Sequence, residues 1–176
     1  ALFLIQRAQT DVPGSAVVAG LEGTRPLLVE IQALVSPTGY GVPRRMTAGV
    51  DYNRVALIAA VLEKRVGLNL GSQDLYVNAV GGVKLDEPAV DLAIACALAS
   101  SFRDVPVDPA LVCAGEIGLT GELRPVTGVE KRIKEAFKMR FSRFLTAAQS
   151  AIPDQEQPGI ITADTLAVAL ELALKV

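Results

Sequence analysis

Basic side chains are concentrated in one stretch of this 176-residue chain. Residues 124–143 hold seven lysines and arginines against two acids, a local charge of +5, whereas the other ten basic and seventeen acidic residues give −7. The seven are Arg124, Lys131, Arg132, Lys134, Lys138, Arg140 and Arg143. Basic side chains bind a nucleic-acid backbone by displacing its counterions. In a chain of net charge −2, this segregation is what a localised phosphate-binding surface requires.

A second, smaller basic cluster lies upstream. It comprises Arg44 and Arg45 in a Gly/Pro-rich stretch, and Arg54, Lys64 and Arg65 on the helix predicted to follow it. The residues alone leave two interpretations open, because basic helix faces are usually solvated and Glu130 can pair with Lys134. No motif of a sequence-reading protein is present, so any DNA binding should be independent of base sequence and sensitive to salt.

Several kinds of chemistry are excluded. The chain contains no histidine, which removes His-based acid–base catalysis and His-ligated metals. Cys96 and Cys113 are too far apart for a CxxC motif, and we expect two buried free thiols. The phosphate-binding pattern GxxxxGK[ST] is absent, so this segment should not hydrolyse ATP. We therefore expect no metal and no cofactor in this segment.

Two segments carry the frame of a serine–lysine protease site. The first is Asp86-Glu87-Pro88-Ala89-Val90-Asp91, and the second runs from Gly115 to Lys131 as GEIGLTGELRPVTGVEK. They resemble the PKDGPSAG and GE-x-x-L-x-G-x-V-x-P-x-G-G-x-K-E-K segments of the Lon proteolytic domain. The resemblance places the nucleophilic serine at Ala89 and the catalytic lysine at Glu130.

Both reactive groups are missing from these positions. A Ser–Lys dyad needs a hydroxyl and an amine that takes its proton, and Ala89 and Glu130 offer neither. Lys131 lies about 100° further around a helix, and Ser100 and Ser101 lie about three turns beyond position 89. The resemblance therefore implies a site inactive in peptide hydrolysis, and a residual peptidase is the least favoured interpretation.

Four upstream sequence segments make the family resemblance more specific. Residues 14–18, 21–35, 43–45 and 49–54 are similar to the C-terminal Lon-like domain of the RadA/Sms family, the bacterial RecA paralogues. This similarity implies one domain, residues 1–176, of a longer protein whose upstream zinc finger and RecA-like ATPase bind zinc and ATP. It implies an ATP-driven branch-migration or helicase factor that acts with RecA in recombinational repair.

The same resemblance implies two roles for this domain. One is contact with duplex or branched DNA, through Arg44, Arg45, Arg54, Lys64, Arg65, Arg124, Lys131, Arg132, Lys134 and Lys138. The other is assembly into a homohexameric ring. The alternative from a different class is a pure oligomerisation module that makes no DNA contact.

The amino-acid composition indicates which class of protein this chain belongs to. With 51% hydrophobic and 20% charged residues, the chain is typical of one globular domain. No apolar run approaches the roughly 20 residues needed to cross a bilayer, and the start lacks a secretion signal. We therefore expect a cytoplasmic protein with no membrane partner.

The apolar pattern predicts alternating strands and helices. We expect strands at 14–21, 25–35, 75–80, 111–117, 143–147 and 159–161, and helices at 53–66, 88–102, 128–141 and from 164. The Gly/Pro-rich residues 36–43 should form an exposed loop or a poorly paired edge. Asp51 should cap the first helix and Gly67 should end it. This order indicates an α/β (α+β) fold, a mixed sheet with packed helices. The resemblance implies the Lon proteolytic-domain fold, related to the second domain of ribosomal protein S5.

Overall fold

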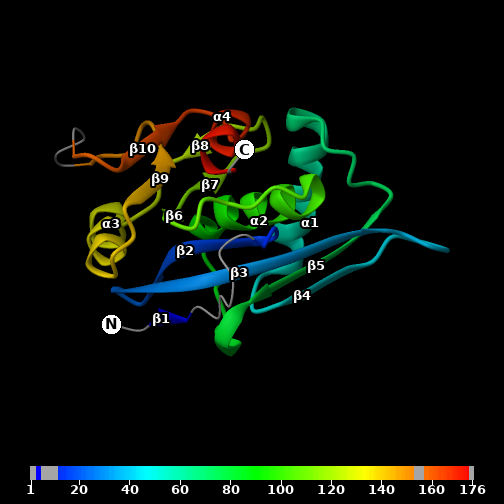
Figure 1. The fold of residues 1–176 in the computed structure, drawn as a ribbon, viewed down its shortest axis with the longest axis horizontal. Helices are drawn as coiled ribbons and strands as arrows, with labels where there is room; N and C mark the ends of the chain where they lie inside the picture. The colour runs from blue at the N-terminus through cyan, green and yellow to red at the C-terminus, as the bar shows by residue number, and fades with distance from the viewer. Residues whose placement is uncertain (1–2, 5–11, 153–156, 175–176) are drawn as a thin grey trace.

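The computed structural model describes residues 3–4, 12–152 and 157–174. A mixed eight-stranded sheet runs in the order β10-β9-β6-β2-β3-β5-β4, with β1 alongside β3, and β7 and β8 form a separate pair (Figure 1). The strands are β1 (Phe3–Leu4), β2 (Ser15–Glu22), β3 (Arg25–Pro37), β4 (Arg45–Ala48), β5 (Gln73–Ala79), β6 (Leu111–Cys113), β7 (Glu116–Ile117), β8 (Leu123–Arg124), β9 (Arg143–Ala147) and β10 (Ile160–Ala163). The predicted mixed sheet with packed helices is confirmed.

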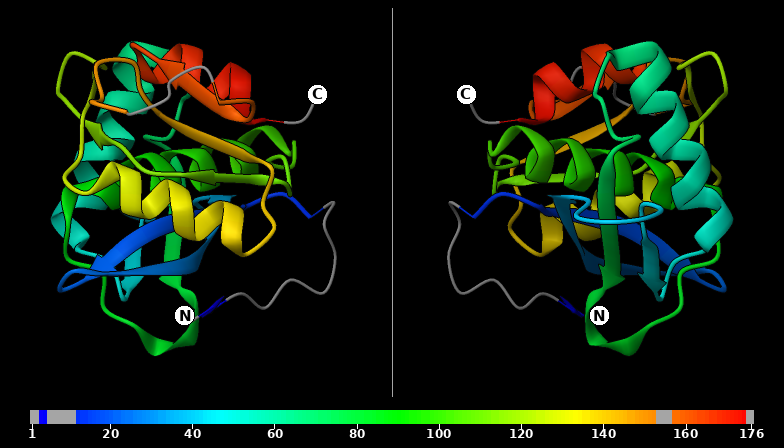
Figure 2. Two further views of the ribbon diagram at one scale, coloured as in Figure 1. Left: turned by 90° about the vertical axis from the view of Figure 1, so that its left-hand side faces the viewer. Right: turned by 90° about the vertical axis from the view of Figure 1, so that its right-hand side faces the viewer.

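Helices cover both faces of this sheet. They are α1 (Tyr52–Val61), α2 (Asp91–Arg103), α3 (Val129–Lys138) and α4 (Leu166–Ala173). The larger hydrophobic cluster joins α1, α2 and α4 to one face, and the smaller cluster joins α3 to the other (Figure 2). Strand β2 supplies both clusters, with Val18 on the first face and Val17 on the second, because successive side chains of a strand alternate.

The predicted hairpin at the start of the domain is confirmed. Strands β2 and β3 pair antiparallel from Ser15↔Gln32 to Glu22↔Arg25. Gly23 takes φ 64 in the turn, a conformation that glycine adopts without steric penalty. The predicted central helix is also confirmed, since every residue from Leu92 to Ala99 on α2 is at most 2% exposed.

The first predicted helix is confirmed with an altered end. The Asp51 carboxylate accepts a hydrogen bond from the Asn53 N–H at 3.2 Å, as expected of a cap. Helix α1 then passes into a π-helical turn, Leu62–Val66, which ends at Gly67 in the left-handed region. None of the described helices has the length and apolar character required to span a bilayer.

One predicted strand is divided in the structure, and one observed strand was not predicted. The strand predicted at 111–117 is broken between β6 and β7, because the Gly115 N–H donates to the Ala89 carbonyl and the Gly115 carbonyl accepts from the Leu92 N–H. This turn ties the chain to the start of α2. Strand β4 was not predicted, since its four residues alternate between exposed and half-buried positions, and it pairs parallel with β5.

Candidate functional site

The two positions at which the resemblance places the dyad lie on neighbouring elements. Ala89 sits in a 3₁₀ turn, Pro88–Val90, that leads into α2, and it is 2% exposed. It packs in the same hydrophobic cluster as Val129, the first residue of α3. The next residue, Glu130, points to solvent, with its side chain 52% exposed and its carboxylate 3.1 Å from the Lys134 Nζ. The fold brings the two segments together and directs residue 130 away from residue 89.

A cavity of about 140 Å³ lies beside Ala89. It is lined by Glu87, Pro88, Ala89, Glu116, Pro125, Val126, Thr127 and Arg132. Thr127 carries the only hydroxyl among these lining residues, and none of them supplies an amine or a thiol. The lining thus offers one hydroxyl, two carboxylates and one guanidinium.

Arg132 anchors α3 to the wall of this cavity. Its Nε donates to the Thr127 carbonyl at 2.9 Å, and one terminal nitrogen donates to the Ala19 carbonyl at 2.8 Å and to the Glu87 carboxylate at 2.5 Å. The second oxygen of that carboxylate accepts the Leu21 N–H at 2.8 Å. Arg132 is 2% exposed. The prediction that it contacts DNA is wrong, because its guanidinium is turned into the protein.

A signal for this burial exists in the sequence. On a helix, residue 132 follows Val129 by three positions and precedes Ala136 by four, so all three share one face. Val129 and Ala136 are buried against the sheet. The helical period alone therefore placed Arg132 on the apolar face of α3, where a guanidinium needs internal acceptors.

The other basic residues of α3 form an exposed stripe, which we call the α3 basic face: Lys131, Lys134 and Lys138. Their i, i+3, i+7 spacing keeps them on one side of the helix. Lys134 pairs with Glu130, whereas Lys131 and Lys138 have no ion pair with any described residue. Arg140, which was not among the predicted contacts, follows directly and is exposed, with φ 70. The sequence pattern gives no signal for the positive φ of Arg140.

The smaller basic cluster is divided by the structure. A terminal nitrogen of Arg45 donates to the Gln73 carbonyl at 2.5 Å, so its guanidinium is engaged with backbone. Arg44, Lys64 and Arg65 are exposed and form no ion pair within the described part of the chain. Their contact with DNA stays a prediction.

Arg124 is held by acids of the β7–β8 pair. Its terminal nitrogens lie 3.0 Å from Glu122 and 3.7 Å from Glu116. The hydrogen bond from the Thr120 hydroxyl, helped by Arg124, lowers the pKa of Glu122 to about 2. The carboxylate therefore keeps its charge at neutral pH, and half-exposed Arg124 stays beside it.

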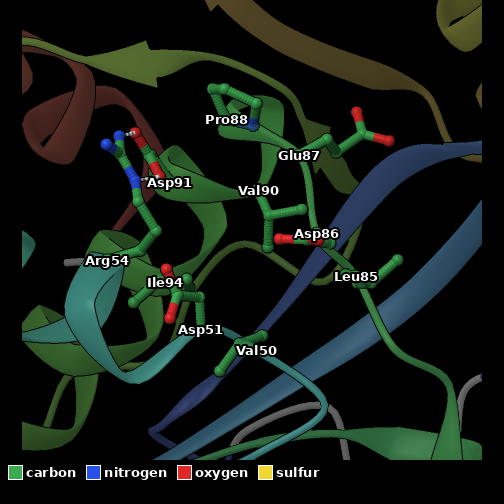
Figure 3. Close-up of a pocket in the computed structure, with 10 residues that line it drawn as sticks. All are labelled: Val50, Asp51, Arg54, Leu85, Asp86, Glu87, Pro88, Val90, Asp91 and Ile94. Atoms are coloured by element: carbon green, nitrogen blue, oxygen red, sulfur yellow. Dashed lines mark hydrogen bonds and ion pairs between the residues drawn. The ribbon is translucent and has the colours of Figure 1, made fainter.

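Arg54 pairs with buried Asp91 in a second cavity of about 140 Å³ (Figure 3). The guanidinium bonds both oxygens of that carboxylate, one of them from Nε at 3.1 Å, and the Ile117 N–H donates to it at 3.1 Å. Burial raises the pKa of Asp91 although Arg54 opposes that shift, and the same bond raises the pKa of Arg54. The pair joins α1 to α2 and β7.

Comparison with known proteins identifies sequence relatives of this chain. Over residues 50–150 the chain matches the family described as subunit ChlI of Mg-chelatase. It is 58% identical over 147 residues to the DNA repair protein RadA of Bacillus subtilis, a match that covers 84% of this chain and 32% of that protein. It is 52% identical over 177 residues to the DNA repair protein RadA of Listeria monocytogenes, covering 98% of this chain and 38% of that protein.

A third relative extends the same pattern. The DNA repair protein RadA of Halalkalibacterium halodurans is 51% identical over 181 residues, covering 98% of this chain and 38% of that protein. The matches fall in the C-terminal part of these relatives. The chain spans about a third of the length of the curated relatives it matches.

Proposed function

This chain belongs to the family described as subunit ChlI of Mg-chelatase and corresponds to the C-terminal part of RadA proteins, and on that premise we propose that it serves DNA repair and recombination. In this proposal it is a Lon-like domain without proteolytic activity. It contributes sequence-independent contacts to duplex or branched DNA, and it joins six copies in a ring. ATP and zinc bind upstream domains of the whole protein, which drive branch migration together with RecA.

The α3 basic face is the observation that carries the DNA role. Lys131 and Lys138 are exposed and have no acidic partner among the described residues, so their charge is available to phosphates. The apolar side of the same helix, with Ile133 and Ala136, is packed on the sheet, which holds the basic face rigidly outward. Backbone contacts by lysine favour any sequence equally.

Binding of a labelled duplex across a salt series tests this role. We expect the double change Lys131→Glu and Lys138→Glu to lower the slope of log K against log salt by about two, since about 0.9 counterions are released per phosphate contact. The matched control is Lys84→Glu with Arg103→Glu, two exposed residues elsewhere that lower the formal net charge of −2 by the same amount.

Two results of the salt series would contradict the DNA role of the α3 basic face. An equal decrease of the salt slope in both double variants would mean that net charge, and not the α3 basic face, governs DNA binding. No binding of the folded chain at low salt would leave the assembly role alone and place the DNA contacts in the upstream domains.

Peptide cleavage tests the inactive-protease role. We expect no cleavage by the unmodified chain, by Ala89→Ser, or by Ala89→Ser combined with Glu130→Lys. Residue 130 is half-exposed, so a lysine there stays hydrated and protonated and does not become a general base. The measurement is release of a fluorescent peptide, with an active Lon-family protease as positive control. Cleavage by the unmodified chain would overturn the inactive assignment, and cleavage by the double variant alone would show that residue 130 turns toward residue 89.

A further inference from the structure

The loop between β3 and β4, residues 38–44, holds an aromatic and an aliphatic side chain out in solvent. We call it the β3–β4 loop. Tyr40 is 103% exposed and Val42 is 84% exposed, and they are the two most exposed of the large hydrophobic residues in the described chain. Gly39 and Gly41 flank Tyr40, and a Cβ built on either glycine would meet no described residue within 4 Å beyond its chain neighbours. The ring of Tyr40 is therefore accessible to a binding partner.

The two ends of this loop are fixed to the segment that begins β5. One oxygen of the Asp74 carboxylate accepts the Arg44 N–H at 2.8 Å and the Thr38 hydroxyl at 2.9 Å. The Thr38 N–H donates to the Ser72 carbonyl at 3.0 Å, and the Arg44 carbonyl accepts the Leu75 N–H at 2.9 Å. The bonds from Arg44 and Thr38 lower the pKa of Asp74, so this carboxylate keeps its charge at neutral pH. A loop whose ends are already ordered loses less conformational freedom when it binds a partner.

The loop and the residues beside it carry positive charge. Residues 36–46 include Arg44 and Arg45 and no acid. The Arg44 side chain is exposed and forms no ion pair within the described part of the chain. Its guanidinium can therefore bind a phosphate close to the Tyr40 ring. An aromatic ring on which a base stacks, combined with cations that follow the backbone, is the combination by which proteins bind single-stranded nucleic acid.

The size of the exposed surface favours a base over a protein as the partner. A stable protein contact buries about 800 Å² per partner, whereas one large aromatic side chain buries about 150–250 Å². Tyr40 and Val42 together do not reach the area of a protein interface. Stacking of one base on one ring is sufficient by itself to change affinity by roughly 5- to 100-fold. In a duplex each base is already stacked between its neighbours, so only an unpaired base can offer its face to the ring.

We propose that the β3–β4 loop binds single-stranded DNA, with an unpaired base stacked on Tyr40 and a neighbouring phosphate beside Arg44. The inference rests on the proposed DNA role and deepens it, because it assigns the single-stranded arm of a branched DNA to this loop. Figure 1 places the β3–β4 loop and α3 at opposite ends of the long axis of the molecule. The single-strand contact and the duplex contact of the α3 basic face are therefore separate surfaces, and each can be removed without the other.

Fluorescence anisotropy with a labelled oligothymidylate and a labelled duplex tests the loop contact. We expect Tyr40→Ala to weaken binding of the single strand by roughly 5- to 100-fold and to change duplex binding by less than about twofold. Arg44→Ala should lower the slope of log K against log salt for the single strand by about 0.7, the value for one phosphate contact. The matched control is Tyr52→Ala, a change at a tyrosine that is 50% exposed at the start of α1, and it should alter neither affinity. Circular dichroism confirms that each variant is folded.

Tryptophan fluorescence gives a second readout that reports stacking directly. The chain contains no tryptophan, so Tyr40→Trp places a single indole on the loop. A base stacked on that indole quenches its emission, and we expect quenching by the oligothymidylate and not by the duplex. Tyr52→Trp should be quenched by neither DNA.

The two experiments separate this inference from the proposed function. Single-strand binding that is absent, that is unchanged in Tyr40→Ala, or that leaves the emission of Tyr40→Trp unquenched would overturn the loop contact. Equal weakening of single-strand and duplex binding by Tyr40→Ala would also overturn it. Duplex binding that still depends on Lys131 and Lys138 would in each case leave the DNA role of the α3 basic face intact. Selective quenching of Tyr40→Trp beside duplex binding that ignores both lysines would support the loop and contradict the α3 contact.

Discussion

Replacing Arg132 by alanine is expected to lower the free energy of unfolding by about 3–5 kcal/mol, the usual effect of breaking a buried ion pair. The change leaves the Glu87 carboxylate and the Ala19 and Thr127 carbonyls without the guanidinium that they share. For a chain of this size the melting temperature should fall by roughly 6–20 °C. Urea unfolding followed by circular dichroism measures the free energy of unfolding, and thermal unfolding followed by the same signal measures the melting temperature.

Lys131→Ala is the matched control, because Lys131 is the exposed neighbour on the same helix. Its effect should stay within about 0.5 kcal/mol, as for most surface substitutions. Arg132→Lys should be intermediate, since an ammonium keeps the charge and lacks the fork that reaches several acceptors. If Arg132→Ala were no more harmful than Lys131→Ala, the burial of this residue would be contradicted. A loss of DNA binding in an Arg132 variant would report altered folding and not a lost phosphate contact.

Replacing Arg54 by alanine is expected to destabilise the fold by about 2–4 kcal/mol at neutral pH. This is less than for a fully buried pair, because the Arg54 side chain is 32% exposed and part of the interaction is screened by solvent. The change leaves Asp91, which is 1% exposed, with the Ile117 N–H as its remaining hydrogen-bond donor among the described residues.

The destabilisation should depend on pH. Burial already raises the pKa of Asp91, and loss of Arg54 removes the group that opposes this shift. The folded variant then binds a proton that the unfolded chain does not hold at the same pH. Its stability relative to the unmodified chain therefore recovers as pH falls through the raised pKa of Asp91, and the deficit is largest above it. Urea unfolding at about pH 7.5 and about pH 5 measures the difference.

A second substitution serves as the control for Arg54. Adding Asp91→Asn to Arg54→Ala replaces the buried charge by a neutral amide. Measured against Asp91→Asn alone, the deficit of this double variant should not change with pH in the acid range. A deficit in Arg54→Ala that grows on acidification, or that is the same in both variants at each pH, would show that Asp91 does not carry the effect.

Periodicity predicted most of the elements because each buries one face. The β2–β3 hairpin alternates with a period of two, and α2 is apolar around its whole circumference, so both elements are visible in local sequence. The break at Ala114–Gly115 and the existence of β4 were not visible. Both depend on hydrogen bonds to distant segments, namely Gly115 with Ala89 and β4 with β5.

The sequence by itself determined that residues 89 and 130 lack a nucleophile and an amine, that basic charge gathers between residues 124 and 143, and that the fold is a mixed sheet with helices. The helical period already placed Arg132 on the apolar side of α3, but only the tertiary structure decided which acceptors its buried guanidinium bonds. Lys131 and Arg132 are adjacent, yet the second bonds the Ala19 carbonyl, 113 residues away, and the Glu87 carboxylate, 45 residues away. A buried guanidinium is stable only where such acceptors converge, and their convergence is a property of the folded chain.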